Sequence, residues 1–346
     1  MDICFLRKVV AYPSFNHNFF CASIIKYLMN FKLLFSFVLV FILYLISPRL
    51  TAQSKNNPDV LTIPADLVNP AIVAGNPKPG ITVLETLPNY SGTEVAYSLY
   101  LPVDWIPGKL FPVMVEYLGN TAQVRDNKGI GYGLSGGKGF IWVVLPFINN
   151  EHTKDVDWWW GDVAATIAYA KEVVPSVCRQ WGGDKSKVIL TGYSRGAIAC
   201  NYIGLHDDAI AKLWKAIVPI SHYDDGHTLW GMTKEEQNLA PERLRRLGKT
   251  PQLICGEYST FPQIGSDKPI LQMLKEKNII TFEEAKKELG LMPITALEGT
   301  RNFIKTIYPS ANQTMIDFPW VNHGSQVLLR PTPERKIIQE WIQKIL

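Results

Sequence analysis

From residue 81 onward, short apolar runs alternate with longer stretches in which apolar residues recur at helical spacing. Short apolar runs bounded by turn-forming residues are typical of buried strands, and a 3.6-residue period is typical of helices that pack on a sheet. Alternation of the two predicts a mainly parallel sheet covered by helices on both faces. We therefore expect one α/β domain over residues 81–346.

The first two apolar runs predict an antiparallel start to the sheet. In chain order, strands are expected at residues 81–87, 94–101, 112–118, 140–145, 188–191, 215–220, 252–255 and 314–318. Helices are expected at residues 161–180, from 197 onward and at 332–346, with a Gly-rich loop at 129–139. Residues 53–80, rich in Pro and Asn, lead into the domain, and the Lys- and Glu-rich residues 266–300 predict helices inserted between the last two strands.

The N-terminal region follows a different pattern. Residues 33–46 form an apolar stretch that follows Lys32 and precedes a small-residue site ending at Ala52. This order is typical of a secretory signal, so we expect residues 1–52 to be removed, with translation starting at the first residue or at Met29. The mature protein is then secreted or periplasmic, without stable membrane insertion. The alternative is an uncleaved N-terminal anchor, although the stretch is shorter than the roughly 20 residues of a membrane span.

Charge and cysteine content narrow the classes of partner. The chain of 346 residues has 35 basic and 31 acidic residues, of which residues 1–52 hold five and one, leaving 30 of each. A balanced mature surface gives no reason to expect a nucleic-acid partner. Cys178, Cys200 and Cys255 match no metal motif and are expected to be buried free thiols, with one disulfide as the alternative.

The most specific chemical motif is Gly192-Tyr193-Ser194-Arg195-Gly196, which joins a β-type apolar run to an Ala-rich helical stretch. The five-residue pattern is weak alone, and its position between a strand and a helix makes it much stronger. A serine alcohol is a poor nucleophile, so it needs a tight turn on which a base can reach its oxygen and backbone N–H groups can face an oxyanion. We interpret the motif as a nucleophile elbow that presents Ser194.

The strand order, this turn and the late Asn322-His323-Gly324 resemble the α/β-hydrolase superfamily from about residue 81 to the end. Three further segments are similar to secreted serine esterases of the polyhydroxybutyrate-depolymerase, feruloyl-esterase and acetylxylan-esterase type, namely residues 100–102, 111–115 and 184–188. The resemblance implies an α/β-hydrolase fold. One departure is Leu118-Gly119-Asn120, where those enzymes usually carry His-Gly-Gly.

A serine esterase also needs a base and a carboxylate that fixes the tautomer of the imidazole. In the superfamily the chain order is serine, acid, histidine, which points to His323 because it follows the last predicted strand, whereas the earlier histidines come one or two strands too soon. For the acid we favour Glu257, after the strand at 252–255. The alternatives are Asp224 or Asp225 after the preceding strand, and then Asp267 or Glu298 in the inserted segment.

The oxyanion hole implied by the resemblance combines the backbone N–H of Arg195 with one from Gly119 or Asn120. The guanidinium of Arg195 is then available for another task. It binds a carboxylate on the substrate, pairs with Glu116 or is solvated, and the sequence does not choose among these.

Three consecutive tryptophans, Trp158, Trp159 and Trp160, follow the fourth predicted strand. Flat indoles suit stacking on sugar rings or aromatic acids, and the loop is expected to open on the active-site edge of the sheet. Because tryptophan more often packs in the interior, we expect only one of the three candidates to be exposed for substrate binding.

The segment His222-Tyr223-Asp224-Asp225-Gly226-His227 contains two imidazoles and two carboxylates, but without an ordered ligand spacing. A metal needs convergent ligands with a second shell, so we interpret the segment as a polar loop and expect neither a metal nor a cofactor.

Together these features predict an exported serine hydrolase that cleaves an ester in a small molecule or on a polysaccharide, such as an acyl or phenolic ester. A peptidase of the same fold is the nearer alternative. A catalytically inactive binding protein of the same fold is the alternative from a different class, and the unusual loop at Gly119 keeps it open.

Overall fold

A computed structural model describes the chain over residues 59–226, 230–259, 272, 275–278, 281–289, 292–293, 297–321 and 323–346. All of them belong to a compact unit of residues 54–346. The predicted signal at residues 1–52 lies outside the described residues. Within the described ranges, no helix combines the length and the apolar character needed to cross a membrane.

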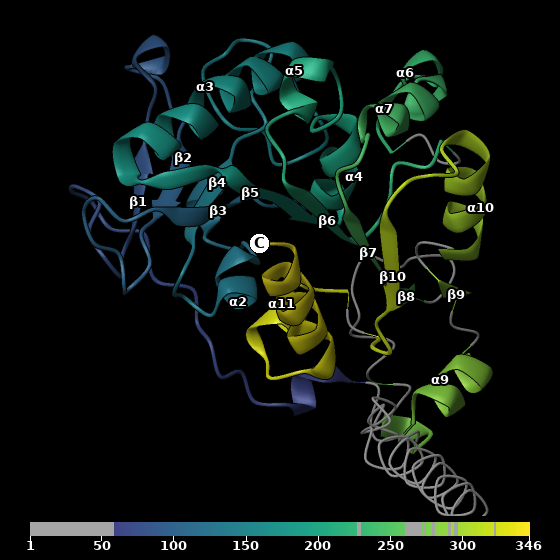
Figure 1. The fold of residues 1–346 in the computed structure, drawn as a ribbon. Helices are drawn as coiled ribbons and strands as arrows, with labels where there is room; N and C mark the ends of the chain where they lie inside the picture. Colours follow the sequence, from purple (N-terminus) through teal and green to yellow (C-terminus); the bar gives the residue numbers. More distant parts are fainter. Residues whose placement is uncertain are drawn as a thin grey trace, which may run out of the picture. The chain divides into compact units, whose positions relative to one another are not determined.

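An eight-stranded sheet forms the centre of this unit (Figure 1). Its strands, in spatial order, are β1 (Thr82–Glu85), β2 (Tyr97–Tyr100), β4 (Ile141–Leu145), β3 (Phe111–Tyr117), β5 (Gly183–Tyr193), β6 (Ala216–Ser221), β7 (Gln252–Gly256) and β10 (Gln313–Asp317). β1 and β2 pair antiparallel, β2 is antiparallel to β4, and the remaining pairs are parallel. The predicted mainly parallel sheet with an antiparallel start is confirmed.

Helices cover both faces of the sheet. Successive residues of a strand point to opposite sides, so one strand contributes side chains to the core on each face. Val113 and Val115 of β3 belong to an apolar core with α3 (Val163–Trp181) and α4 (Arg195–Tyr202). Met114, between them, belongs to a second core with α2 (Gly131–Ser135) and α11 (Pro333–Ile345). Figure 1 shows α3 and α4 on one side of the sheet and α2 and α11 on the other.

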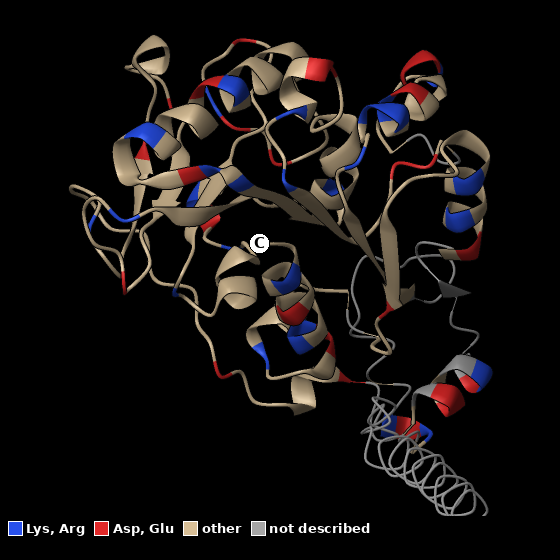
Figure 2. Ribbon diagram, viewed as in Figure 1, with Lys and Arg blue, Asp and Glu red and all other residues tan. Residues whose placement is uncertain are grey.

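Shorter elements complete the described chain. They are α5 (Asp208–Ala211), α6 (Lys234–Asn238), α7 (Ala240–Arg246), α9 (Phe282–Leu289), α10 (Leu297–Ile307), the paired strands β8 (Tyr258–Ser259) and β9 (Met292–Pro293), and the 3-10 turns η1 (Val60–Thr62), η2 (Pro88–Tyr90), η3 (Val124–Asp126) and η4 (Ser325–Leu329). The peripheral helices carry Lys and Arg together with Asp and Glu (Figure 2).

The loop predicted at residues 129–139 is wrong in part, because this stretch contains α2. The buried carboxylate of Glu116 accepts the N–H groups of Ile130 and Gly131 at 2.8 and 2.9 Å, which satisfies two donors at the start of the helix. A Cβ on Gly131 would lie 2.3 Å from the Trp142 ring, so close packing rather than loop freedom explains this glycine. Glu116 and Trp142, which contact the start of α2, lie outside residues 129–139. The composition of that stretch therefore gives no sign of them.

The lead-in segment is tied to the domain. Val60 is buried in the core that contains α11, and Asp66 forms a bidentate ion pair with Arg335 of α11 at 2.7 and 2.6 Å. Cys178, Cys200 and Cys255 are free, as favoured from the sequence. Cys200 and Cys255 are buried as expected, whereas the expected burial of Cys178 is wrong, because this residue is half-buried.

Candidate active site

The turn between β5 and α4 has the geometry of a strained nucleophile elbow. Ser194 connects the two elements with φ 56° and ψ −119°, a backbone conformation that residues other than glycine rarely adopt. It is half-buried, whereas every residue of α4 is buried. The strain is therefore located at the one residue of the turn that remains accessible.

Two glycines allow the strand and the helix to approach closely. A Cβ on Gly196 would lie 1.8 Å from the carbonyl oxygen of Tyr117 in β3, and a Cβ on Gly192 would lie 2.2 Å from the carbonyl oxygen of Gly196. Any side chain at either position would meet backbone, so the motif needs glycine for space.

The structure brings together Ser194, His323 and Glu257. Nε2 of His323 lies 3.3 Å from Oγ of Ser194, and Nδ1 lies 2.9 Å from Oε2 of Glu257. The Glu257 side chain is only 3% exposed, and that of His323 is 31% exposed. Because an ionised carboxylate only accepts hydrogen bonds, Nδ1 carries the imidazole proton in this arrangement and Nε2 is left to accept from the serine.

The three residues come from separate segments that end at one edge of the sheet. Ser194 follows β5, Glu257 follows β7, and His323 lies beyond β10. Since β7 lies beside β10 and β5 is separated from β7 only by β6, parallel pairing carries their carboxyl ends to the same place.

The alternative acids have other partners. Arg243 donates two hydrogen bonds to Asp224, at 2.7 and 3.0 Å, and both side chains are buried. Asp225 accepts a hydrogen bond from Thr300 of α10 at 3.4 Å. Glu298 is exposed in the first turn of α10, and Asp267 lies outside the described residues. Glu257, by contrast, forms a hydrogen bond with His323.

Tyr193, which precedes Ser194, contacts the same group of residues, and the sequence did not reveal this contact. Its hydroxyl donates to both carboxylate oxygens of Glu257 at 2.9 Å and lies 3.1 Å from Nδ1 of His323. The position was visible inside the elbow motif, but nothing in the motif indicates that this side chain reaches the acid. Tyr193 therefore holds the carboxylate from a second direction.

A second histidine lies beside the first. The rings of His222 and His323 are 5.5 Å apart, and Ser221 is within 2.7 Å of Nδ1 of His222 and 3.4 Å of Nδ1 of His323. Burial lowers the pKa of His222 to about 3, with the neighbouring imidazole as a smaller cause. It is therefore uncharged at neutral pH and adds no positive charge next to His323. The sequence did not indicate a place for His222 beside His323, because His222 follows an earlier strand than the one expected for the base.

The predicted oxyanion donors lie next to Ser194. Arg195 is the first residue of α4, and Ser194 makes no side-chain capping bond, so the N–H of Arg195 is among those a helix leaves unsatisfied at its start. Gly119 follows β3, and a Cβ placed on it would lie 3.4 Å from Cβ of Ser194. The Asn120 side chain accepts the N–H of Trp159 at 3.0 Å, which leaves its backbone N–H as its candidate donor.

The expectation that the Arg195 guanidinium is free is wrong. The residue is 1% exposed, and its guanidinium donates to backbone carbonyls rather than to a carboxylate. It is also not paired with Glu116, which binds the N–H groups at the start of α2 and Nε1 of Trp142. Arg195 therefore cannot bind a substrate carboxylate, and it is not a solvated surface charge.

The three tryptophans differ in exposure. Trp158 is 58% exposed, Trp159 is half-buried, and Trp160 is buried with its ring 4.7 Å from that of Tyr202 in α4. The backbone N–H of Trp159 donates to the side chain of Asn120, in the loop that approaches Ser194. The exposed indole belongs to Trp158, the residue before Trp159 in the chain. One indole is thus available to a ligand.

No group of three or more metal-ligating side chains occurs in the described part of the chain. Within the candidate polar loop, His222 contacts Ser221 and Asp224 pairs with Arg243. His227 lies outside the described residues.

The sheet order, the strained serine after the fifth strand and the histidine beyond the last strand define an α/β-hydrolase fold. No protein-family model matches the chain, and no curated protein does. Among solved structures, the chain is similar to carboxyl esterase 2 of Tuber melanosporum, at 13% identity over 83% of this chain and 93% of that one, with a TM-score of 0.49. It is also similar to the fluorophosphonate-binding serine hydrolase F of Staphylococcus aureus, at 13% identity over 78% and 99% of the two chains, with a TM-score of 0.46. A third is a thermostable esterase, at 15% identity and a TM-score of 0.43, of which the chain spans 62% while 76% of this chain is covered.

Proposed function

We propose that the protein is a serine hydrolase that cleaves carboxylic esters, with Ser194 as nucleophile, His323 as general base and Glu257 as the orienting acid. The observation that carries the proposal is the continuous set of contacts from Ser194 Oγ through the two ring nitrogens of His323 to Glu257, at 3.3 and 2.9 Å. Burial of Glu257 supports its role, because a water-excluded carboxylate fixes the tautomer of the imidazole.

Acylation follows from this geometry. Ser194 Oγ attacks the ester carbonyl carbon while its proton moves to Nε2 of His323. The carbonyl oxygen becomes an oxyanion that accepts hydrogen bonds from the N–H of Arg195 and from the loop at Gly119 and Asn120. Collapse of the tetrahedral intermediate breaks the bond to the alcohol, which takes the proton from Nε2 and leaves Ser194 acylated.

Deacylation repeats the sequence with water. His323 Nε2 removes a proton from a water molecule, whose oxygen attacks the acyl carbon and forms a second oxyanion in the same place. Return of the proton to Ser194 Oγ releases the carboxylic acid. Throughout, Glu257 stabilises the imidazolium without taking its proton.

We place the substrate among acyl or phenolic esters attached to saccharides. The exposed Trp158 supports this class, because an indole face suits a sugar or phenolic ring and lies next to the loop that approaches Ser194. The sequence resemblance to secreted esterases of the feruloyl-esterase and acetylxylan-esterase type supports it as well. Export is part of the proposal and rests on the apolar stretch at residues 33–46.

The test is a panel of p-nitrophenyl acetate, methyl ferulate and acetylated xylan, with Ser194→Ala as the matched control. We expect turnover of at least one ester, and a loss of about 10⁴-fold or more in kcat in the control. If no ester is turned over faster by the wild-type protein than by the variant, the esterase proposal is wrong. Hydrolysis of peptide amides alone would identify a peptidase instead.

A further inference from the structure

Two loops meet over the buried side chain of Arg195. The first, residues 118–122, follows β3 and is called the oxyanion loop below. The second, residues 156–160, precedes α3 and is called the tryptophan loop. A Cβ on Gly119 of the oxyanion loop would lie 3.4 Å from Cβ of Ser194. The tryptophan loop reaches the same turn through the Arg195 side chain, from which its bonded carbonyls are separated by 36 and 39 residues in the chain.

The guanidinium binds backbone carbonyl oxygens in both loops. Its contacts with the oxyanion loop are Nε to Leu118 at 3.3 Å, Nη2 to Gly119 at 3.0 Å and Nη2 to Ala122 at 3.2 Å. Its contacts with the tryptophan loop are Nη1 to Val156 at 3.3 Å and Nη1 to Trp159 at 2.7 Å. All five acceptors are neutral, and the flat group stacks 4.0 Å from the ring centroid of Phe147.

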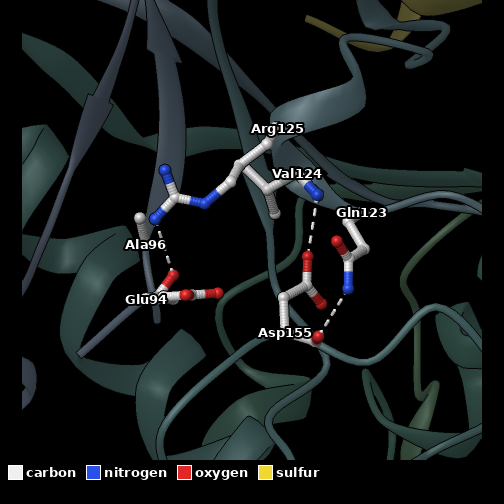
Figure 3. A pocket seen from close by; sticks show the side chains of 6 residues that line it. All are labelled: Glu94, Ala96, Gln123, Val124, Arg125 and Asp155. Carbon is white, nitrogen blue, oxygen red and sulfur yellow. Dashed lines mark hydrogen bonds between the residues drawn. The ribbon is translucent and has the colours of Figure 1, made fainter.

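The loops are also bonded to each other. The N–H of Thr121 donates to the carbonyl of Asp157 at 2.6 Å, and that of Trp159 donates to the side chain of Asn120 at 3.0 Å. Asp155 holds the two residues that follow the oxyanion loop, since its carboxylate accepts the N–H of Val124 and its carbonyl accepts the Gln123 side chain, at 2.7 and 2.8 Å (Figure 3). Arg195 therefore contacts both loops in the region where they bond to each other.

Two of these carbonyls belong to the peptide units that matter for the oxyanion. The carbonyl of Leu118 shares its peptide unit with the N–H of Gly119, and the carbonyl of Gly119 shares its unit with the N–H of Asn120. A cation that hydrogen-bonds to the oxygen of an amide withdraws charge from the unit and makes its N–H a stronger donor. Burial amplifies the effect, because little solvent screens the guanidinium.

We propose that Arg195 is a positioning residue of the hydrolase reaction, and this inference rests on the proposed function. Its side chain fixes and polarises the peptide units that carry the N–H groups of Gly119 and Asn120, while its own backbone N–H supplies another donor to the oxyanion. The same side chain locks the tryptophan loop to this donor set. Transition-state stabilisation, rather than substrate binding, is therefore the step that depends on the guanidinium.

Arg195→Met tests the proposal, because it removes the charge and the donors but keeps an unbranched side chain. Loss of one oxyanion donor costs about 10²–10³ in kcat. Here the donors remain but are weakened, so we expect kcat for p-nitrophenyl acetate to fall about 10- to 100-fold, with KM within about threefold of wild type. Rates are expressed per active site titrated with a fluorophosphonate, so that partial unfolding does not count as a loss. Affinity for a trifluoromethyl ketone, which forms a tetrahedral oxyanion on the serine, falls in parallel.

Arg195→Lys keeps the proposal testable if the methionine variant does not fold. Lysine retains the charge but cannot bind carbonyls on both loops, so we expect a smaller loss in kcat, between wild type and Arg195→Met. The matched control is Arg243→Lys, since Arg243 is similarly buried and its guanidinium lies 5.1 Å from the Tyr202 ring, but it bonds to Asp224 and to the carbonyl of Glu236 instead of to the two loops. Its kcat per active site should stay within about twofold of wild type.

Two results overturn the inference. One is an unchanged kcat per active site in both Arg195 variants, and the other is a loss confined to KM. If the wild-type protein hydrolyses esters in either case, the proposed function stands and only the role of Arg195 is wrong. Failure of the wild-type protein to hydrolyse any ester would overturn both.

Discussion

The imidazole of His323 is surrounded by four side chains from three parts of the chain. Glu257 and Tyr193 lie within 3.1 Å of Nδ1, Ser194 faces Nε2, and His222 packs against the ring. Tyr193 has a distinctive position, because its hydroxyl donates to the same carboxylate that accepts from the imidazole. It restricts the carboxylate to an orientation in which Nδ1 keeps its proton.

Tyr193→Phe should lower kcat about 10-fold and leave KM nearly unchanged, because a hydrogen bond to a charged group contributes about 1.5–3 kcal/mol. Steady-state kinetics on p-nitrophenyl acetate measures the effect. Tyr117→Phe is the matched control, since its buried hydroxyl has no hydrogen-bond partner among the described residues. Equal kcat in Tyr193→Phe and wild type would show that Glu257 is held without the tyrosine.

His222 makes a prediction about stability in acid. Burial holds its pKa near 3 in the folded protein, against about 6.5 in the unfolded chain. Below pH 6.5 the unfolded chain therefore binds the additional proton, so stability is present above pH 6.5 and is lost as pH falls toward 3. In urea unfolding between pH 7 and pH 4, His222→Gln should lose less stability than wild type, by on the order of 3 kcal/mol. The same loss in both proteins would contradict the assignment.

Among the elements, the β5–α4 turn and the two loops above it determine the site. The periodicity of the sequence was sufficient to predict the strands and the long helices. The apolar residues that define each of these elements lie within a few positions of one another in the chain, so the pattern is local. It failed at α2, where Glu116 from β3 satisfies the first N–H groups of the helix, and it understated β5, whose exposed first half carries charged residues. The contact of Glu116 with α2 and the exposure of the first half of β5 both depend on tertiary structure, which the local sequence does not show.

Gly196→Ala should destabilise this turn severely. The added Cβ would lie 1.8 Å from a carbonyl oxygen of β3, so the strand or the helix must move. We expect a loss of about 3 kcal/mol or more in urea unfolding, the upper range for overpacking. Gly324→Ala, next to His323, is the matched control, because a Cβ added there would meet no atom of the described residues within 4 Å. Equal stability of the two variants would mean that the close approach of β3 and α4 is not needed.

At the scale of the whole molecule, the sheet converts residues far apart in sequence into one site. Ser194 was predictable from a local motif and His323 from its place after the last strand, whereas strand order left Asp224 and Asp225 as alternatives to Glu257. The partners of Arg195 and Tyr193 were not predictable, since they depend on which loop lies over which strand. From the sequence, the Arg195 guanidinium could bind a substrate carboxylate, pair with Glu116 or be solvated, whereas in the fold it binds backbone carbonyls.

The most direct test of the central claim is the site of covalent modification by a fluorophosphonate, mapped by mass spectrometry of peptides from the folded protein. An activated serine attacks this probe, and the adduct reports the nucleophile without knowledge of the substrate. We predict about one adduct per chain at Ser194, no adduct in Ser194→Ala, and much slower labelling in His323→Gln. A folded wild-type protein that is unlabelled, or labelled at another residue, would contradict the account.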